Sequence, residues 1–370
     1  MENSRSDDLS ISVIVPVKNS TRTIRDLLDS LMEMDYDEEM LEIIVVDGHS
    51  NDGTRKIVEE YPVLLMDEEG FGVNAARNTG IKWSSGEIIA FTDGDCVVPP
   101  DWARNIAKNL RDPNVSFVGG PVRGYDKESI LSVYMDETFF QVKPSSRWRS
   151  EATDLSLHQF PAGCNMAFRR HALEKVNFFD ERIAFGFDDL DPVEKLASRG
   201  FRIIMDPDVT VLHQHRTSLP EVLRQHFNYG RGGALLAIHK RTSKLASWFT
   251  AYLFTSTFAL SLIAALICSG LLLGYGLLVH LGIGLLLLGF LLLTTLYVEI
   301  ALSERSLRKL ILYPALDFVR GLCFTSGGLT QLFRELAGAG AGHGTFKARS
   351  SEIMAEDVPV AEAVQGGGPV

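Results

Sequence analysis

The chain has 370 residues, of which 46% are hydrophobic and 22% charged, and its formal net charge at pH 7 is -11. This length allows one large soluble domain and additional elements. The acidic balance, without a basic stripe interleaved with aromatic residues, argues against a nucleic-acid partner. The 4 cysteines lack C-x-x-C spacing and indicate neither a zinc site nor a disulfide framework.

The first half of the chain alternates apolar runs with helical patterns. Residues 11–19, ISVIVPVKN, predict a strand buried on both faces of a parallel sheet, and a helix follows from Thr21. A second strand over 43–46 ends in Asp47 and is followed by a helix over 54–60. This alternation, with acids at strand ends, predicts a doubly wound α/β sheet. Pro16 stands where a dinucleotide-binding domain has its glycines, which disfavours a dehydrogenase.

A third apolar strand, over 88–92, ends in Asp93, Gly94 and Asp95. Open α/β sheets bind ligands at the carboxyl ends of their strands. Two carboxylates one residue apart can hold a hard divalent cation that takes other ligands from water and substrate phosphates. The stretch therefore predicts a site for a nucleoside diphosphate with Mg²⁺ or Mn²⁺. An ordinary acidic turn is the alternative.

Two further segments place charged residues near this strand end. A helix over about 74–83 carries Arg77 and Asn78, and the guanidinium fork of Arg77 suits a diphosphate, although a surface helix cation is the alternative. Asp188, Asp189 and Asp191 stand at the head of an amphipathic helix. A helix dipole favours acids there without any catalytic role, so a plain helix start is the alternative.

The second half of the chain contains two long apolar runs, over 247–273 and 277–298, without Asp, Glu, Lys or Arg. About 20 apolar residues suffice to cross a bilayer. Basic residues on both flanks predict a hairpin with both ends on the cytoplasmic side. The polar N-terminus MENSRSDDLS lacks an apolar signal region, which agrees with a cytoplasmic soluble domain. Asp317 and Arg320 argue against a third crossing.

These patterns predict an organisation in six parts. They are a disordered N-terminus over 1–9, an α/β domain over 10–217, an interfacial amphipathic helix over 218–246, two transmembrane helices over 247–300, interfacial or re-entrant helices over 301–336, and a disordered tail over 337–370.

Six segments, VPVKN, VVDGHSNDGT, AARNTGI, FTDGDC, AGCNMAFRR and GFDDLD in that order, closely resemble an inverting family 2 glycosyltransferase of the GT-A fold. An ordered set is far more specific than any single motif. The resemblance implies that Pro16, Val17, Asn19 and Asp47 form a nucleoside site and that Asp93 and Asp95 bind the metal and the diphosphate. It also implies that Asp189, with Asp188, supplies the general base. The acceptor side is expected at Gly163, Asn165 and Arg231. A histidine after the last strand completes the metal site in some relatives, so the resemblance implies this role for His213 or His215, and a solvent-facing histidine is the alternative.

Two departures from the family pattern narrow the expected reaction. Asp188 stands where the family usually has Glu, and RQHFNYGRGG stands where processive synthases have Gln-x-x-Arg-Trp. We therefore expect transfer of a single sugar from a UDP- or GDP-sugar to a lipid-linked acceptor at the membrane. A processive polysaccharide synthase, a sugar nucleotidyltransferase and a non-catalytic membrane scaffold are the alternatives. The nucleotidyltransferase is disfavoured because VPVKNS replaces its glycine- and basic-residue-rich loop.

Overall fold

The computed structural model describes residues 9–138, 149–152, 161–240 and 243–339. The chain divides into two compact units, residues 1–331 and 332–370, and the sheet and the candidate site lie in the first. The predicted disordered ends, over 1–9 and 337–370, fall almost entirely outside the described residues.

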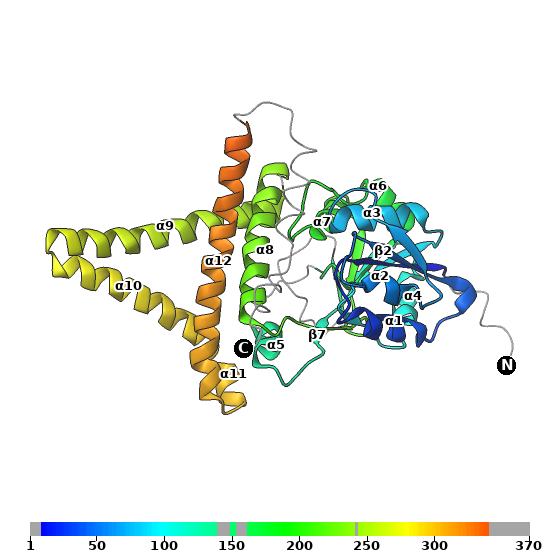
Figure 1. Cartoon of the computed structure of the whole chain (residues 1–370), viewed down its shortest axis with the longest axis horizontal. Helices are drawn as coiled ribbons and strands as arrows, with labels where there is room; N and C mark the ends of the chain where they lie inside the picture. The colour runs from blue at the N-terminus through cyan, green and yellow to red at the C-terminus, as the bar shows by residue number, and fades with distance from the viewer. Residues whose placement is uncertain (1–8, 139–148, 153–160, 241–242, 340–370) are drawn as a thin grey trace, which may run out of the picture. The chain divides into compact units, whose positions relative to one another are not determined.

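Within the described residues, the larger sheet has 8 strands in the order β3-β2-β1-β4-β9-β6-β10-β8. It lies in the N-terminal part of the chain, coloured blue to green in Figure 1. The strands are β1 (Ile11–Val17), β2 (Leu41–Asp47), β3 (Leu64–Asp67), β4 (Ile88–Phe91), β6 (Val115–Gly119), β8 (Ser150–Ala152), β9 (Met166–Arg169) and β10 (Arg202–Met205). β1 runs parallel to β2 and β4, whereas β9 runs antiparallel to β4 and β6. The predicted doubly wound mixed α/β sheet is confirmed, and it brings the ends of β1, β2 and β4 to one edge.

Helices cover both faces of this sheet because successive strand residues point to opposite sides. Along β1, Val13 and Val15 pack into the core of one face and Ile14 into the core of the other, and all three are fully buried. The first face is covered by α1 (Ile24–Met32), α2 (Thr54–Val58) and α4 (Trp102–Leu110). The second is covered by α3 (Val73–Trp83), α6 (Arg170–Lys175) and α7 (Leu190–Ser198). A short 3-10 helix, η1 (Glu38–Met40), precedes β2.

A smaller sheet, in the order β5-β11-β7, lies beside the end of β4. It consists of β5 (Cys96–Val97), β7 (Val122–Gly124) and β11 (Val211–His213). His213 is paired with Cys96 on one side and with Gly124 on the other. Three segments far apart in the sequence therefore meet next to Asp95.

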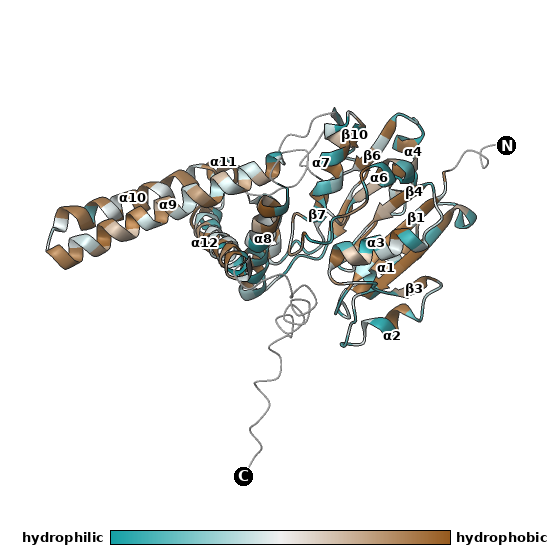
Figure 2. Ribbon diagram, turned by 90° about the horizontal axis from the view of Figure 1, so that it is seen from above, coloured by the Kyte–Doolittle hydropathy of each residue, from teal (hydrophilic) through white to brown (hydrophobic). Residues whose placement is uncertain are grey.

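The C-terminal half is helical. Its helices are α8 (Leu219–His239), α9 (Lys244–Leu273), α10 (Gly276–Thr295), α11 (Val298–Ser303) and α12 (Leu307–Ala339). α9 and α10 pack side by side and carry the apolar residues coloured brown in Figure 2. Both are long and apolar enough to cross a membrane, and only 6% of the most apolar window of each is buried. α12 is one helix with Pro314 inside it, not the pair of helices expected over 301–336.

A buried polar network joins α12 to α5 (Ile130–Glu137) and to α8. The Asp317 carboxylate accepts hydrogen bonds from Tyr134 at 2.5 Å and Thr138 at 2.8 Å, and Tyr297 also donates to it. Arg320 bonds Tyr134 and contacts the ring of His226. Burial, together with the charge of Arg320, lowers the pKa of His226 to about 3. The charges that argued against a third crossing are thus satisfied inside the protein, and they fix α5 in place.

Candidate active site

The loops after β1 and β2 are hydrogen-bonded to each other at the predicted nucleoside edge. Asn19 has φ 52, a left-handed conformation that asparagine tolerates. Its backbone N–H donates to Ser50 Oγ, and its Oδ1 accepts from the Asn51 N–H, both at 2.9 Å. Asp47 is 2% exposed and accepts from the Ser50 N–H. Val17 is buried and Pro16 is half-buried, so the edge is a rigid platform at the strand ends.

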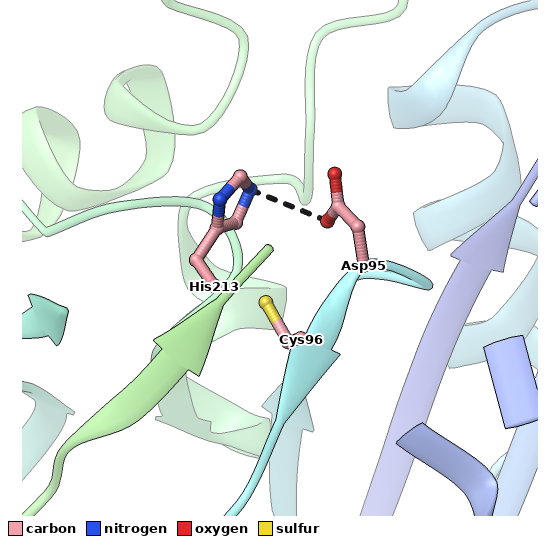
Figure 3. A group of neighbouring side chains, drawn as sticks. All are labelled: Asp95, Cys96 and His213. Atoms are coloured by element: carbon pink, nitrogen blue, oxygen red, sulfur yellow. Dashed lines mark ion pairs between the residues drawn. The ribbon is translucent and has the colours of Figure 1, made fainter. Parts of the chain in front are cut away.

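Asp95 and His213 face each other at the junction of the two sheets (Figure 3). Asp95 Oδ1 lies 3.3 Å from His213 Nε2, and both side chains are partly exposed. The register of β5 with β11 produces this encounter, because it places His213 opposite the residue after Asp95. Of the two histidines considered from the sequence, His213 is therefore the one beside the acid pair.

Asp95, Cys96 and His213 each have a potential ligand atom within 4.8 Å of the others. Burial raises the pKa of Cys96 well above its ordinary value, and a hydrogen bond with Cys164 raises it further. A protonated thiol is a poor partner for Mg²⁺ or Mn²⁺, which prefer oxygen ligands. Of these three residues, Asp95 and His213 therefore offer the ligand atoms suited to a hard cation, and Asp93 is not a member of the group.

The two strand-end carboxyls differ in their electrostatic surroundings. Burial raises the pKa of Asp93, and the charge of Asp95 raises it further against the opposing charge of Arg77. Burial also acts to raise the pKa of Asp95, but His213 outweighs it and lowers the pKa. The charge of Asp93 also raises the pKa of Asp189, so the acidic cluster lies within electrostatic range of the strand end.

The three acids at the start of α7 have three different environments. Asp188 forms an ion pair with Arg77 at 2.6 Å, and both side chains are almost fully buried. Asp191 pairs with Lys195 at 2.5 Å and with Lys240 at 3.0 Å. Asp189 occupies the N-cap position of α7 but makes no side-chain capping bond, and it has no ion-pair partner among the described residues. A plain helix cap therefore does not explain Asp189.

Asp189 is the acid whose electrostatics suit a proton acceptor. Burial and the charge of Asp188 together raise its pKa to about 7, against the opposing charge of Arg77. Gly163 lies directly against it, since a Cβ added to Gly163 would come within 2.8 Å of Asp189 Oδ2 and 2.6 Å of Arg77 Nη2. Only glycine lets this turn pass over both charged groups.

The structure changes the interpretation of Arg77 and Asn78. Arg77 is 2% exposed, and its Nη1 bonds Asp188 and Asn74, so it does not present an open fork to a diphosphate. Asn78 donates to the Phe179 carbonyl at 3.0 Å and to Glu181 at 2.8 Å. Both side chains hold the loop that precedes the acidic cluster. Their helix positions were predicted, but the loop that covers them was not.

Two residues expected on the acceptor side are structural instead. Asn165 is fully buried, and its side chain bonds Trp102 Nε1, the Pro121 carbonyl and the Val209 carbonyl. Arg231 is 6% exposed, stacks over the Phe185 ring at 3.8 Å and donates to Gln331. Sequence alone cannot distinguish such buried polar side chains from binding residues, because both types lie beside the motifs.

Three residues that the sequence did not single out also belong to this region. Asn74 donates to the backbone carbonyls of Asp180, Ile183 and Asp188 and so fixes the acidic loop. Glu68, at the end of β3, is half-buried; burial raises its pKa to about 7, with Lys18 opposing. Asp136, from α5, contacts His215. Asn74 begins the predicted helix over 74–83, whereas no strand was predicted before Glu68 and the segment around Asp136 has no clear periodicity.

The fold and these strand-end acids define a nucleotide-sugar-dependent glycosyltransferase of the GT-A type. The chain belongs to glycosyl transferase family 2, and its residues 12–176 match the sequence model of that family. It is 30% identical over 230 residues to glycosyltransferase AglE of Haloferax volcanii, which covers 60% of this chain and 72% of that protein. It is 27% identical over 248 residues to the pre-mycofactocin glycosyltransferase of Mycobacterium tuberculosis, which covers 62% of this chain and 47% of that one.

A solved structure extends the similarity beyond the matched family segment. The mannosyltransferase PcManGT from Pyrobaculum calidifontis, in complex with GDP-Man and Mn²⁺, is 26% identical to this chain. The alignment covers 88% of each chain with a TM-score of 0.58. The predicted enzyme class and the GT-A-like fold are confirmed.

Proposed function

We propose that this protein is a membrane-held, inverting glycosyltransferase that moves a single sugar from a nucleoside-diphospho-sugar to a hydroxyl or phosphate of a lipid-linked acceptor. The observation that carries the proposal is the convergence of two acid groups at one sheet edge. Asp95 faces His213 there, and Asp189, with its raised pKa, lies within electrostatic range of Asp93. The strand-end acids beside His213 suit the donor diphosphate, and Asp189 suits deprotonation of an acceptor.

A divalent cation fits the strand-end residues. Two ligand atoms bound at right angles to a Mg²⁺-sized ion at about 2.1 Å lie about 3 Å apart. Asp95 Oδ1 and His213 Nε2 lie 3.3 Å apart without any rearrangement. Asp93 and Asp95 with His213 would hold Mg²⁺ or Mn²⁺, which when bound neutralises charge that develops on the departing nucleoside diphosphate. The Mn²⁺ in the mannosyltransferase structure supports this choice of ion.

The remaining residues position the two substrates. Pro16, Val17, Asn19 and Asp47 form the platform proposed for the nucleoside. Arg77 neutralises Asp188 at 2.6 Å, which leaves Asp189 as the acid of the cluster without an ion-pair partner in the described chain. Asp189 takes the proton of the acceptor hydroxyl as it attacks, and a phosphate acceptor attacks with an oxygen that is already charged. Attack on the face opposite the leaving group inverts the anomeric carbon.

The acceptor assignment rests on the helical half of the chain. We assign 10–217 to the catalytic domain, 218–246 to an interfacial helix, 247–300 to a membrane hairpin and 301–336 to the helical segment that packs beside it. The apolar surface of α9 and α10 supports a membrane location, and a lipid-linked acceptor would reach a site held at the bilayer. The basic residues flanking the hairpin favour the cytoplasmic side, although Lys240 and Lys309 are engaged in ion pairs inside the protein.

The test is transfer of a radiolabelled sugar by the full-length protein in nanodiscs that contain a polyprenyl phosphate. GDP-mannose, UDP-N-acetylglucosamine and UDP-glucose would be compared as donors, because the donor base and sugar are open. At least one donor should yield a labelled lipid with wild-type protein and none with Asp95→Asn, because a phosphate acceptor needs the donor site but not the base. Hydrolysis of every donor to free sugar, without labelled lipid, would show that the acceptor is not a polyprenyl phosphate. No turnover of any donor would argue for a non-catalytic scaffold.

A further inference from the structure

A chain of hydrogen bonds leads from His213 away from Asp95 and ends on α5. His213 Nδ1 lies 3.0 Å from His215 Nδ1, and His215 Nε2 lies 2.8 Å from Asp136 Oδ1. Asp136 Oδ2 accepts from the Gly124 N–H at 2.6 Å. The His215 side chain is only 5% exposed, whereas that of Asp136 is 30% exposed. The chain therefore connects the strand-end site to a carboxylate on a different element.

The residue types determine the direction of these hydrogen bonds when His213 acts as a ligand. A metal-bound histidine is neutral and coordinates through the lone pair of one ring nitrogen. Coordination by Nε2 leaves the proton of His213 on Nδ1, which donates to His215 Nδ1. A neutral His215 then carries its own proton on Nε2, and this nitrogen faces the Asp136 carboxylate, which accepts. Every nitrogen in the chain thus has one role, and His213 Nε2 keeps its lone pair toward Asp95.

We propose that His215 and Asp136 are positioning residues that hold His213 in the tautomer and orientation required for binding a divalent cation through Nε2. The inference rests on the proposed metal-assisted function of the strand-end site. Partners of this kind raise the basicity of a coordinating imidazole and commonly change metal affinity by about 10–100-fold. Neither residue touches the substrates in this account.

The fold supports this role by fixing both ends of the chain. β11 places His213 opposite Gly124, so the backbone donor to Asp136 lies in the adjacent strand. A Cβ on Gly124 would lie 2.5 Å from Asp136 Oδ2, so glycine at this position leaves room for the carboxylate. On α5, Tyr134 and Thr138 flank Asp136 and are both bonded to the buried Asp317. Asp136 is therefore presented by an anchored helix and not by a mobile side chain on the surface.

The experiment is a titration of Mn²⁺ into the full-length protein with GDP present and, in parallel, with UDP present, followed by electron paramagnetic resonance of the free ion. His215→Phe removes the acceptor of His213 Nδ1, and Asp136→Ala removes the terminal carboxylate. His171→Phe and Glu128→Ala make the same chemical changes at exposed positions outside the chain of hydrogen bonds. Melting temperatures of the metal-free proteins would show whether each variant is folded.

Both test variants should bind Mn²⁺ about 10–100-fold more weakly than wild type, with the double variant little worse than either single one. The two controls should stay within about twofold. Asp136→Asn keeps an acceptor oxygen without the charge and should fall between Asp136→Ala and wild type. If Asp136→Ala binds Mn²⁺ with wild-type affinity, the inference is wrong. Because Asp136 is partly exposed, this variant also provides the test if His215→Phe does not fold. Absence of Mn²⁺ binding by wild type would instead refute the metal-assisted function itself.

Discussion

Replacing Asp189 with asparagine should raise the thermal stability of the protein while it removes base catalysis. The Asp189 carboxyl is half-buried, lies beside the negative charge of Asp188 and has no ion-pair partner among the described residues. Ionising it in the folded state is therefore costly. Asparagine has nearly the same shape but needs no desolvated charge.

The pKa gives the sign and the size of the effect. Burial raises the pKa of Asp189 from 3.8 to about 7, so the folded state binds a proton more tightly than the unfolded chain. The free energy of unfolding contributed by this group therefore falls as pH rises from about 4 to about 7 and is constant above that range. One pKa unit corresponds to about 1.4 kcal/mol, so Asp189→Asn should gain on the order of 2–4 kcal/mol at pH 8 and little at pH 4.

The assay is thermal unfolding of the metal-free protein at pH 4.5 and pH 8, with Asp191→Asn as the matched control. Each kcal/mol corresponds to about 2–4 °C for a domain of roughly 200 residues. Asp191 is paired with Lys195 and Lys240, so its replacement should lower the melting temperature at pH 8. Sugar transfer to a hydroxyl acceptor by Asp189→Asn should fall by about a hundredfold to ten-thousandfold. An Asp189→Asn protein that melts below wild type at pH 8 would refute the electrostatic reasoning.

Three further predictions concern the buried ion pair, the helix contacts and the membrane. Arg77→Met leaves the buried Asp188 without its cation and should lower the free energy of unfolding by about 3–5 kcal/mol in denaturant titrations; a change below about 1 kcal/mol would contradict the pairing. Gly230→Ala places a Cβ 1.9 Å from the Phe324 carbonyl and should destabilise the protein by about 1–3 kcal/mol, whereas Gly284→Ala, with open space around it, should not lower the melting temperature. The full-length chain should stay in carbonate-washed membranes and a chain truncated after Arg241 should be retained less; recovery of the full chain in the soluble fraction would exclude the hairpin.

The sequence predicted the elements whose signals are local. Apolar runs located β1, β2 and β4, and the runs of β2 and β4 end in acids. Parallel strands necessarily bring Asp47, Asp93 and Asp95 to one edge. The two apolar helices were equally clear, because their length and composition are sufficient. These features depend on short windows of sequence, which is why pattern alone could identify them.

The rest depends on contacts between distant segments. Arg77 was expected to bind the diphosphate, with a surface helix cation as the alternative, but the loop before α7 covers it. Phe185 and Phe187 in that loop adopt positive φ values that no propensity would predict. Asp136 lies in a segment without periodicity, and its role appears only when β7 and β11 pair. The motifs therefore could not predict which polar side chains are buried or which residues they pair with.

Donor turnover by the purified protein in excess chelator, before and after Mn²⁺ is restored, tests the central claim most directly. Turnover of the active nucleotide sugar should be lost on chelation and return with Mn²⁺. Asp95→Asn should not be rescued at the Mn²⁺ concentration that restores wild type, because one of the two facing ligands is changed. Full turnover in excess chelator would contradict the assignment of Asp93, Asp95 and His213 to a metal-assisted transfer site.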